Sequence, residues 1–83
     1  MPLILISCNL NKPENDYPKL ITYLEQIGAK RVLYSEWMLK SNDSRDAIFD
    51  DVRRCIDADD RLMVCDVNSA IGTANLMHAL NTF

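Results

Sequence analysis

The chain has 83 residues, of which 48% are hydrophobic and 25% are charged, and its formal net charge is −3. This length holds one domain, and the composition is that of a folded protein rather than a disordered one. The acidic balance argues against a domain whose main task is to grip polyanions, although a local basic patch is compatible with it.

The N-terminal part predicts a strand, a polar loop and a helix. Leu3–Ile6 is an apolar run that is too short for a helix and rich in branched side chains, so it predicts a strand. Pro13 stops regular structure in the loop that follows, and Asp16 is the predicted N-cap of the first helix. Gly28 suits the left-handed position after that helix. The apolar stripe of the helix comprises Tyr17, Leu20, Ile21, Leu24 and Ile27.

The middle of the chain predicts a hairpin, a second helix and a last strand. Arg31–Lys40 is rich in Val, Tyr and Trp, and its length fits two short strands with a reversal near Ser35 and Glu36 better than one strand. The second helix runs from about Arg45 to Ile56, with acidic residues early and arginines late, as the helix dipole favours. Arg61–Val67 alternates in polarity and predicts a strand, with Leu62, Val64 and Asp66 on one face.

The C-terminal tail, Asn68–Phe83, contains no Asp, Glu, Lys or Arg. Thr73 is a candidate cap for a short helix carrying Leu76, Met77 and Leu80, while a fifth strand is the alternative. An uncharged, half-apolar segment is unfavourable in water, so we expect it to pack on the sheet or on a second subunit.

The predicted order is strand, helix, two strands, helix and strand, followed by the tail. This order is the split βαβ arrangement of a ferredoxin-like domain. We therefore expect an α+β fold of the βαββαβ type over residues 1–83. Its antiparallel four-stranded sheet would carry both helices on one face, with a C-terminal extension at 68–83.

The cysteines and the absence of a leader predict the compartment. Cys8, Cys55 and Cys65 are an odd number without a CxxC spacing, and each lies in an apolar segment. Buried free thiols in a reducing compartment fit this pattern best. No basic region precedes an apolar one, and no apolar run reaches roughly 18 residues. We expect a cytoplasmic protein that makes no membrane contact.

Few residues carry a chemical signal. Asn9 and Asn11, at the tip of the first strand, either orient a phosphate or a water or cap their own loop. The acidic run Asp57, Asp59 and Asp60 lacks the spacing of an EF-hand and fits a solvated helix end better than a cation site. His78 has no Cys or carboxylate at ligand spacing, and no nucleotide or hydrolase motif is present.

The basic residues are a further candidate. Arg53, Arg54 and Arg61, with Lys30 and Arg31, form either a small basic patch or an ordinary mixed surface, because acidic residues are interleaved with them. Asp66 alternates with apolar residues in the last strand and lies either in solvent or near the open face of the sheet.

Three stretches carry a family resemblance: LISCNLNKPENDYPKL (Leu5–Leu20), YSEWMLK (Tyr34–Lys40) and DADDRLMVCDV (Asp57–Val67). The chain resembles the SinR-like bacterial family, whose members are related to Cas-two, the ferredoxin-fold subunit of the CRISPR spacer-acquisition complex. The resemblance implies a two-fold homodimer in which the segment after the fourth strand extends to the partner. It also implies either a metal-dependent nuclease or a structural role in organising nucleic acid.

In the catalytic pattern of that family an Asp ends the first strand and meets its dimer mate at the metal, and this position reads Asn9 here. The substitution removes the carboxylate, so the resemblance implies a non-catalytic module that binds nucleic acid or protein and needs no cofactor. The nucleic-acid-binding candidates are Asn11, Lys12 and Arg31. The alternative is an RNase or DNase dependent on Mg²⁺ or Mn²⁺, with Asp16 or Asp66 supplying the carboxylate. A small-molecule-binding regulatory domain is a third possibility.

Overall fold

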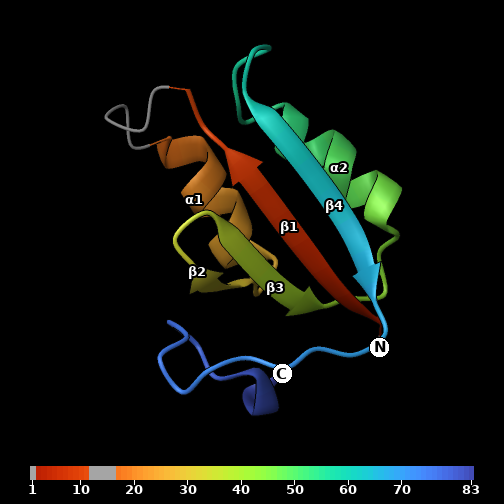
Figure 1. Ribbon diagram of the computed structural model, residues 1–83. Helices are drawn as coiled ribbons and strands as arrows, with labels where there is room; N and C mark the ends of the chain where they lie inside the picture. The colour runs from red at the N-terminus through yellow and green to blue at the C-terminus, as the bar shows by residue number, and fades with distance from the viewer. Residues whose placement is uncertain (1, 12–16) are drawn as a thin grey trace.

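A computed structural model describes residues 2–11 and 17–83. Its strands pair in the order β2-β3-β1-β4, antiparallel throughout (Figure 1). Both helices lie on the same face of this sheet. The fold is therefore α+β with an antiparallel four-stranded sheet, and it is compatible with a ferredoxin-like fold. The elements are β1 (Leu3–Asn9), α1 (Pro18–Gln26), β2 (Lys30–Leu33), β3 (Glu36–Lys40), α2 (Arg45–Arg53), β4 (Arg61–Val67) and the 3₁₀ helix η2 (Leu80–Thr82).

Strand β1 is the centre of the sheet, paired with β3 on one side and with β4 on the other. Its alternate residues Ile4, Ile6 and Cys8 point to the helices and are buried, as period-two side-chain direction requires. Leu20 and Leu24 of α1, with Ile48 and Val52 of α2, belong to the same buried cluster. One layer of helices thus covers one face of the sheet around β1.

The other face of the sheet is covered less completely. The pairing of Leu5 with Met38 and with Cys65 places all three on the face opposite the helices. Met38 is buried there, whereas Leu5 and Cys65 are only partly buried and Met63 is 56% exposed. The β1–β4 half of this face therefore presents apolar side chains to the surroundings.

The limits of α2 and α1 differ from the sequence-based expectation, whereas Asn9 lies at the tip of β1 as predicted. Strand β1 continues beyond the apolar run Leu3–Ile6, because Cys8 and Asn9 pair with Leu62 and Arg61 of β4. Sheet pairing here outweighs the low strand propensity of Ser and Asn. Helix α2 ends at Arg53, earlier than the predicted Ile56.

The N-cap of α1 is Tyr17 rather than Asp16, and Asp16 lies outside the described residues. Tyr17 adopts a left-handed conformation, with φ 43° and ψ 61°, and makes no side-chain capping bond. Pro18 follows in the first turn, where its missing N–H leaves no helical bond unmade. At the other end Gly28 has φ 83°, as predicted for a residue after the helix.

The predicted hairpin and the predicted last strand are confirmed. Arg31–Lys40 does divide into two strands with the turn at Tyr34 and Ser35, and β4 has the predicted bounds. The Ser44 hydroxyl accepts a 3.1 Å hydrogen bond from the Ala47 N–H and caps α2. Among the described residues, no helix combines the length and the apolar character that crossing a bilayer requires.

The tail forms less helix than the stripe at Leu76, Met77 and Leu80 predicts. Only η2 is helical in the tail: Thr73–Leu76 is a single turn, closed by the bond from the Leu76 N–H to the Thr73 carbonyl, and Ala79 before η2 is extended. The Met77 N–H donates a 3.0 Å bond to the Val32 carbonyl, so the tail lies beside β2 (Figure 1). His78 and Phe83 contact each other edge to face within the tail.

The core makes a quantitative prediction. Leu24→Ala removes a side chain with no exposed surface and leaves a cavity between α1 and the sheet, so it should lower the free energy of unfolding by about 2–5 kcal/mol. The same substitution at Leu33, which is 46% exposed, should change it by no more than about 0.5 kcal/mol. Urea titrations of both variants test this. Equal losses would mean that α1 does not bury its stripe as described.

Candidate functional site: the pocket beside the β1 tip

A pocket of about 680 Å³ lies between the end of β1, the inner face of α1 and the β2–β3 hairpin. This is within the size range of small-molecule sites. Its apolar floor and its polar rim come from elements distant in sequence, which the sheet brings together. The lining residues are Cys8, Asn9, Leu10, Tyr17, Leu20, Ile21, Glu25, Arg31, Tyr34, Ser35 and Trp37.

Arg31 is the charged centre of the pocket. It pairs with Trp37 across the hairpin, so both side chains point to the helix side. The Arg31 guanidinium carbon lies 4.7 Å from the centre of the Trp37 ring and 5.8 Å from that of Tyr34. These contacts hold the planar cation against an aromatic wall.

The hydrogen-bonding capacity of Arg31 is not used up by the fold. Its Nε–H is buried and has no acceptor among the described residues, and none of their carboxylates forms an ion pair with Arg31. Glu25 lines the same pocket but lies beyond ion-pair distance. A buried donor without an acceptor costs roughly 1–3 kcal/mol. Because the buried Nε is closed to solvent, a ligand oxygen in the pocket would accept from the other guanidinium N–H groups.

Cys8 is the only sulfur in the lining, and its environment makes it a poor nucleophile. Burial raises its pKa from 9.0 to about 11, the negative charge of Asp60 adds to this, and Arg31 opposes it. At neutral pH the side chain is therefore a protonated thiol, whereas nucleophilic cysteines are activated by a lowered pKa. Cys8 forms the pocket floor and does not supply chemistry.

Asn9 and Asn11, the two asparagines predicted at the strand tip, have different roles. Asn9 is exposed and lines the pocket. Asn11 is held by the turn before β4: its backbone N–H donates to Asp60 Oδ1 at 2.8 Å and its side-chain amide donates to the Asp59 carbonyl at 2.8 Å. The Asn11 amide therefore fixes the loop through the distant turn before β4, and not by capping its own loop.

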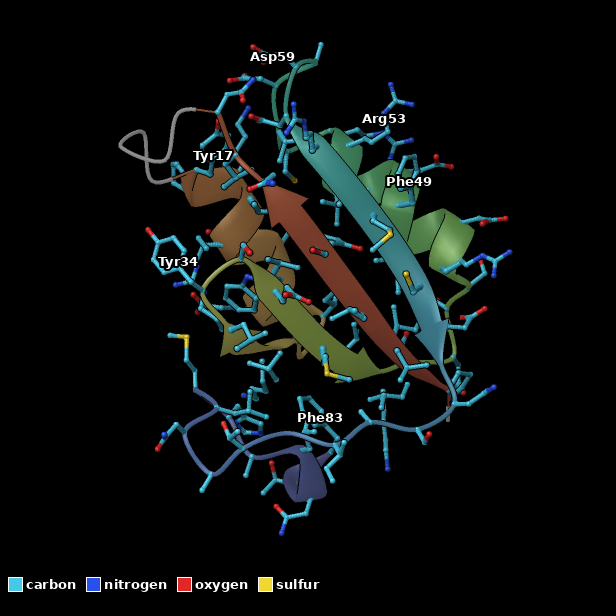
Figure 2. The ribbon with its side chains drawn as sticks, in the orientation of Figure 1. Tyr17, Tyr34, Phe49, Arg53, Asp59 and Phe83 are labelled. Atoms are coloured by element: carbon cyan, nitrogen blue, oxygen red, sulfur yellow. The ribbon has the colours of Figure 1, made fainter. Side chains whose placement is uncertain are left out.

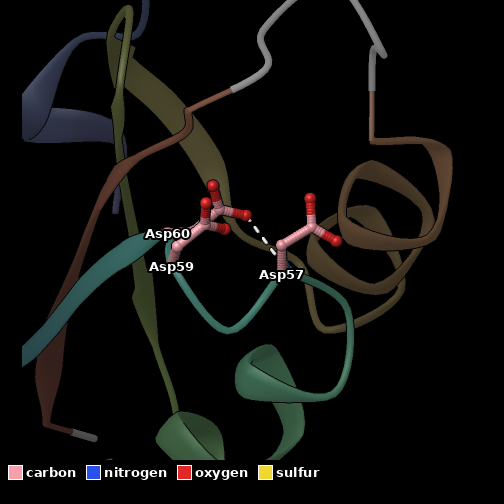
Figure 3. A group of neighbouring side chains, drawn as sticks. All are labelled: Asp57, Asp59 and Asp60. Atoms are coloured by element: carbon pink, nitrogen blue, oxygen red, sulfur yellow. Dashed lines mark hydrogen bonds between the residues drawn. The ribbon is translucent and has the colours of Figure 1, made fainter.

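Asp60 is the acceptor that joins three segments. It accepts from Asn11 N–H, from Asp57 N–H at 2.8 Å and from the Tyr17 hydroxyl at 3.1 Å. Figure 3 shows Asp57 and Asp59 beside it in the same turn. The three carboxylates lie close enough for a cation, but two of them are exposed and Asp60 is occupied by protein donors. The cluster is explained by its structural role.

The other predicted residues do not gather at the pocket. Asp66 faces the helix side and pairs with Arg45 of α2 at 3.0 Å. It lies opposite Ile4, five residues along β4 from the partner of Asn9, or about 17 Å at about 3.4 Å per residue. Lys12 and Asp16 lie outside the described residues. Two of the nucleic-acid-binding candidates, Asn11 and Arg31, are described, and of these only Arg31 lines the pocket, as Asn9 also does.

Sequence reasoning missed Tyr34, Ser35 and Trp37 as site residues. The signal that was available is an Arg and two aromatics within seven residues around a predicted turn, a combination typical of anion and base recognition. Trp37 is nearly buried and belongs both to the core and to the pocket wall.

Comparison with known proteins gives no assignment: no protein-family model, no curated protein and no solved structure matches the chain. The resemblance to the SinR-like and Cas-two families therefore stays a prediction from the residues. Function has to be argued from the pocket itself.

The role assigned to Asp60 can be tested by its removal. Asp60→Ala leaves the N–H groups of Asn11 and Asp57 without their acceptor and should lower the free energy of unfolding by about 1–3 kcal/mol. Asp59→Ala removes a neighbouring carboxylate without a side-chain bond to a described residue and should cost no more than about 0.5 kcal/mol. Chemical unfolding of both variants measures the difference. If Asp59→Ala cost as much, the acidic cluster would act through its charge rather than through these bonds.

Proposed function

We propose that this protein is a non-catalytic module that binds single-stranded nucleic acid, built on a ferredoxin-like domain of the Cas-two-like type. The observation that carries the proposal is the Arg31 guanidinium held between Tyr34 and Trp37 in a pocket that also contains Asn9. Single-stranded binders combine a cation for the backbone with aromatic rings for the bases. Such a site is compatible with the net charge of −3 of the chain, because one local cation is enough to contact one phosphate.

The arrangement of the sheet supports the choice of domain type. The order β2-β3-β1-β4, with α1 and α2 on one face, is what a βαββαβ ferredoxin-like chain requires. A fold of this kind hosts many functions, so the function rests on the pocket and not on the fold. A cytoplasmic location belongs to the same proposal.

The residues around the strand tip support binding over hydrolysis. Metal-dependent hydrolysis needs carboxylates that fix a divalent cation, and Asn9 offers a neutral amide at the strand end. Asp66 is about 17 Å away along β4 and is paired with Arg45. The Asp60 carboxylate, in the turn before β4, already accepts hydrogen bonds from Asn11, Tyr17 and Asp57.

A homodimer completes the proposal. The β1–β4 half of the sheet face opposite the helices carries partly exposed apolar side chains: Leu3, Leu5, Met63, Cys65 and Val67. Strand β4 is an edge strand, and its outer side pairs with no strand among the described residues. An apolar face beside an open edge suits a second copy of the chain, and burying it would add to the small core of an 83-residue domain.

The function is tested with labelled single- and double-stranded RNA and DNA, with and without Mn²⁺, using the wild type and Asn9→Asp. We expect wild type to bind single strands without cutting them, because it has the cation and the aromatics, while the strand-end residue Asn9 is a neutral amide. Binding is followed by fluorescence anisotropy and cleavage by gel electrophoresis.

Two results would contradict this function. Cleavage by the wild type that a chelator abolishes would establish the nuclease alternative and direct attention to Asp16. Failure of every strand to bind at low salt, where phosphate contacts are strongest, would leave protein binding as the role of the module. Cleavage by Asn9→Asp alone would agree with the proposal, because it restores the missing carboxylate.

The homodimer makes a separate prediction. Met63→Glu places a charge in the apolar β1–β4 face and should shift the protein from dimer to monomer, as measured by sedimentation velocity. Leu33→Glu, on the opposite edge strand and also exposed, is the control and should remain dimeric. A wild type that is monomeric at micromolar concentration would refute the dimer.

A further inference from the structure

We infer that the pocket beside Arg31 accommodates one nucleoside monophosphate unit, with its phosphate on the Arg31 guanidinium and its base against the Tyr34 ring. The inference rests on the proposed function, since it names the chemical unit that the same site takes. Two sources can supply this unit, namely a free nucleotide and the terminal nucleotide of a single strand. Figure 2 shows Tyr34 projecting outward at the hairpin turn.

The phosphate position follows from the state of Arg31. The guanidinium is already oriented by Trp37 at 4.7 Å, its Nε–H has no acceptor in the described ranges 2–11 and 17–83, and no carboxylate there neutralises it. A planar guanidinium offers paired N–H donors that match two phosphate oxygens. Because the fold has fixed the cation in advance, binding loses little side-chain freedom there.

The base position follows from Tyr34. Tyr34 lies in the hairpin turn and is 78% exposed, and the centre of its ring lies 5.8 Å from the Arg31 guanidinium carbon. An exposed aromatic ring beside a cation gives a flat ligand one face to stack on, and stacking of this kind is tolerant of base identity. The guanidinium and the ring are therefore close enough for one nucleotide to contact both, with its phosphate on Arg31 and its base on Tyr34.

The remaining lining limits how the unit can sit. Leu10, Leu20 and Ile21 make an apolar side, while Ser35 and Asn9 are polar residues of the lining. Glu25 is the one carboxylate among the lining residues, and it repels phosphate but accepts hydrogen bonds from hydroxyl groups. The phosphate should accordingly lie on the hairpin side and the sugar hydroxyls toward α1. A volume of about 680 Å³ is in the range of pockets for ligands of this size.

Trp37 makes the test direct because it is the single tryptophan of the chain and forms the pocket wall. Its fluorescence should change saturably when adenosine monophosphate is added to the full-length protein. Adenosine and inorganic phosphate are the part-ligands, and each should bind at least about tenfold more weakly because each lacks one contact.

Variants separate the site from general charge effects. Arg31→Gln should weaken adenosine monophosphate at least about tenfold, because the charge and the fork are both lost. Arg53→Gln is the matched control, since Arg53 also lies over an aromatic ring, Phe49, but outside the pocket (Figure 2). If Arg31→Gln does not fold, judged by its thermal melting, Tyr34→Ala replaces an exposed side chain and should weaken the nucleotide while leaving inorganic phosphate unchanged.

The sources are distinguished by comparing adenosine monophosphate with oligonucleotides that do or do not carry a terminal phosphate. If only strands with a terminal phosphate compete with adenosine monophosphate, the natural ligand is a strand end. If no strand competes, the natural ligand is a free nucleotide, which refutes the single-strand function while the pocket stands. No saturable change at millimolar adenosine monophosphate would overturn the inference. Equal affinity for inorganic phosphate, or equal losses in Arg31→Gln and Arg53→Gln, would overturn it as well. Strand binding that does not depend on Arg31 would then leave the proposed function standing without this pocket.

Discussion

The burial of alternate β1 side chains is the constraint on which the rest of the fold depends. Ile4, Ile6 and Cys8 must be removed from water on one face, and two helices are needed to cover them. Because β1 is hydrogen-bonded on both edges, its register fixes which residues of β3 and β4 share that face. The apolar stripe ends at Cys8, and there the covered core opens into the pocket.

The charge at this opening depends on one irregularity in the hairpin. A regular two-residue turn at Tyr34 and Ser35 would pair Val32 with Trp37 and turn Arg31 to the other face of the sheet. The register shift between Arg31 and Leu33 inserts one extra residue into β2, so Arg31 pairs with Trp37 instead. Bulges re-aim side chains, and here the result is a cation on the helix side, within cation–π distance of two rings.

This irregularity also marks the limit of what the sequence predicted. Periodicity was sufficient for α1 and for β4, because those elements follow clear apolar patterns. The division of Arg31–Lys40 followed from its length, which is long for one strand. It was insufficient at Arg31, since a bulge reverses the face without altering composition. It was insufficient at Asn11 as well, because the Asp60 carboxylate that holds it lies 49 residues away. The stripe in the tail does not decide between a helix and a fifth strand, and only the three residues of η2 are helical.

Two side chains of opposite charge, Asp60 and Arg31, flank the β1 tip and have different roles. On the β4 side, Asp60 is a carboxylate whose hydrogen-bond partners include donors from three segments, so it fixes the backbone around the tip. On the hairpin side, Arg31 is a cation whose Nε–H has no acceptor in the part of the chain that the structure describes, and its guanidinium lies against aromatic rings. A guanidinium packed against aromatic faces has N–H groups that are still available to a ligand, whereas in an ion pair with a carboxylate those N–H groups would already be hydrogen-bonded. The tip is therefore arranged to receive an anion, and Asn9, being neutral, adds a polar contact there without repelling it.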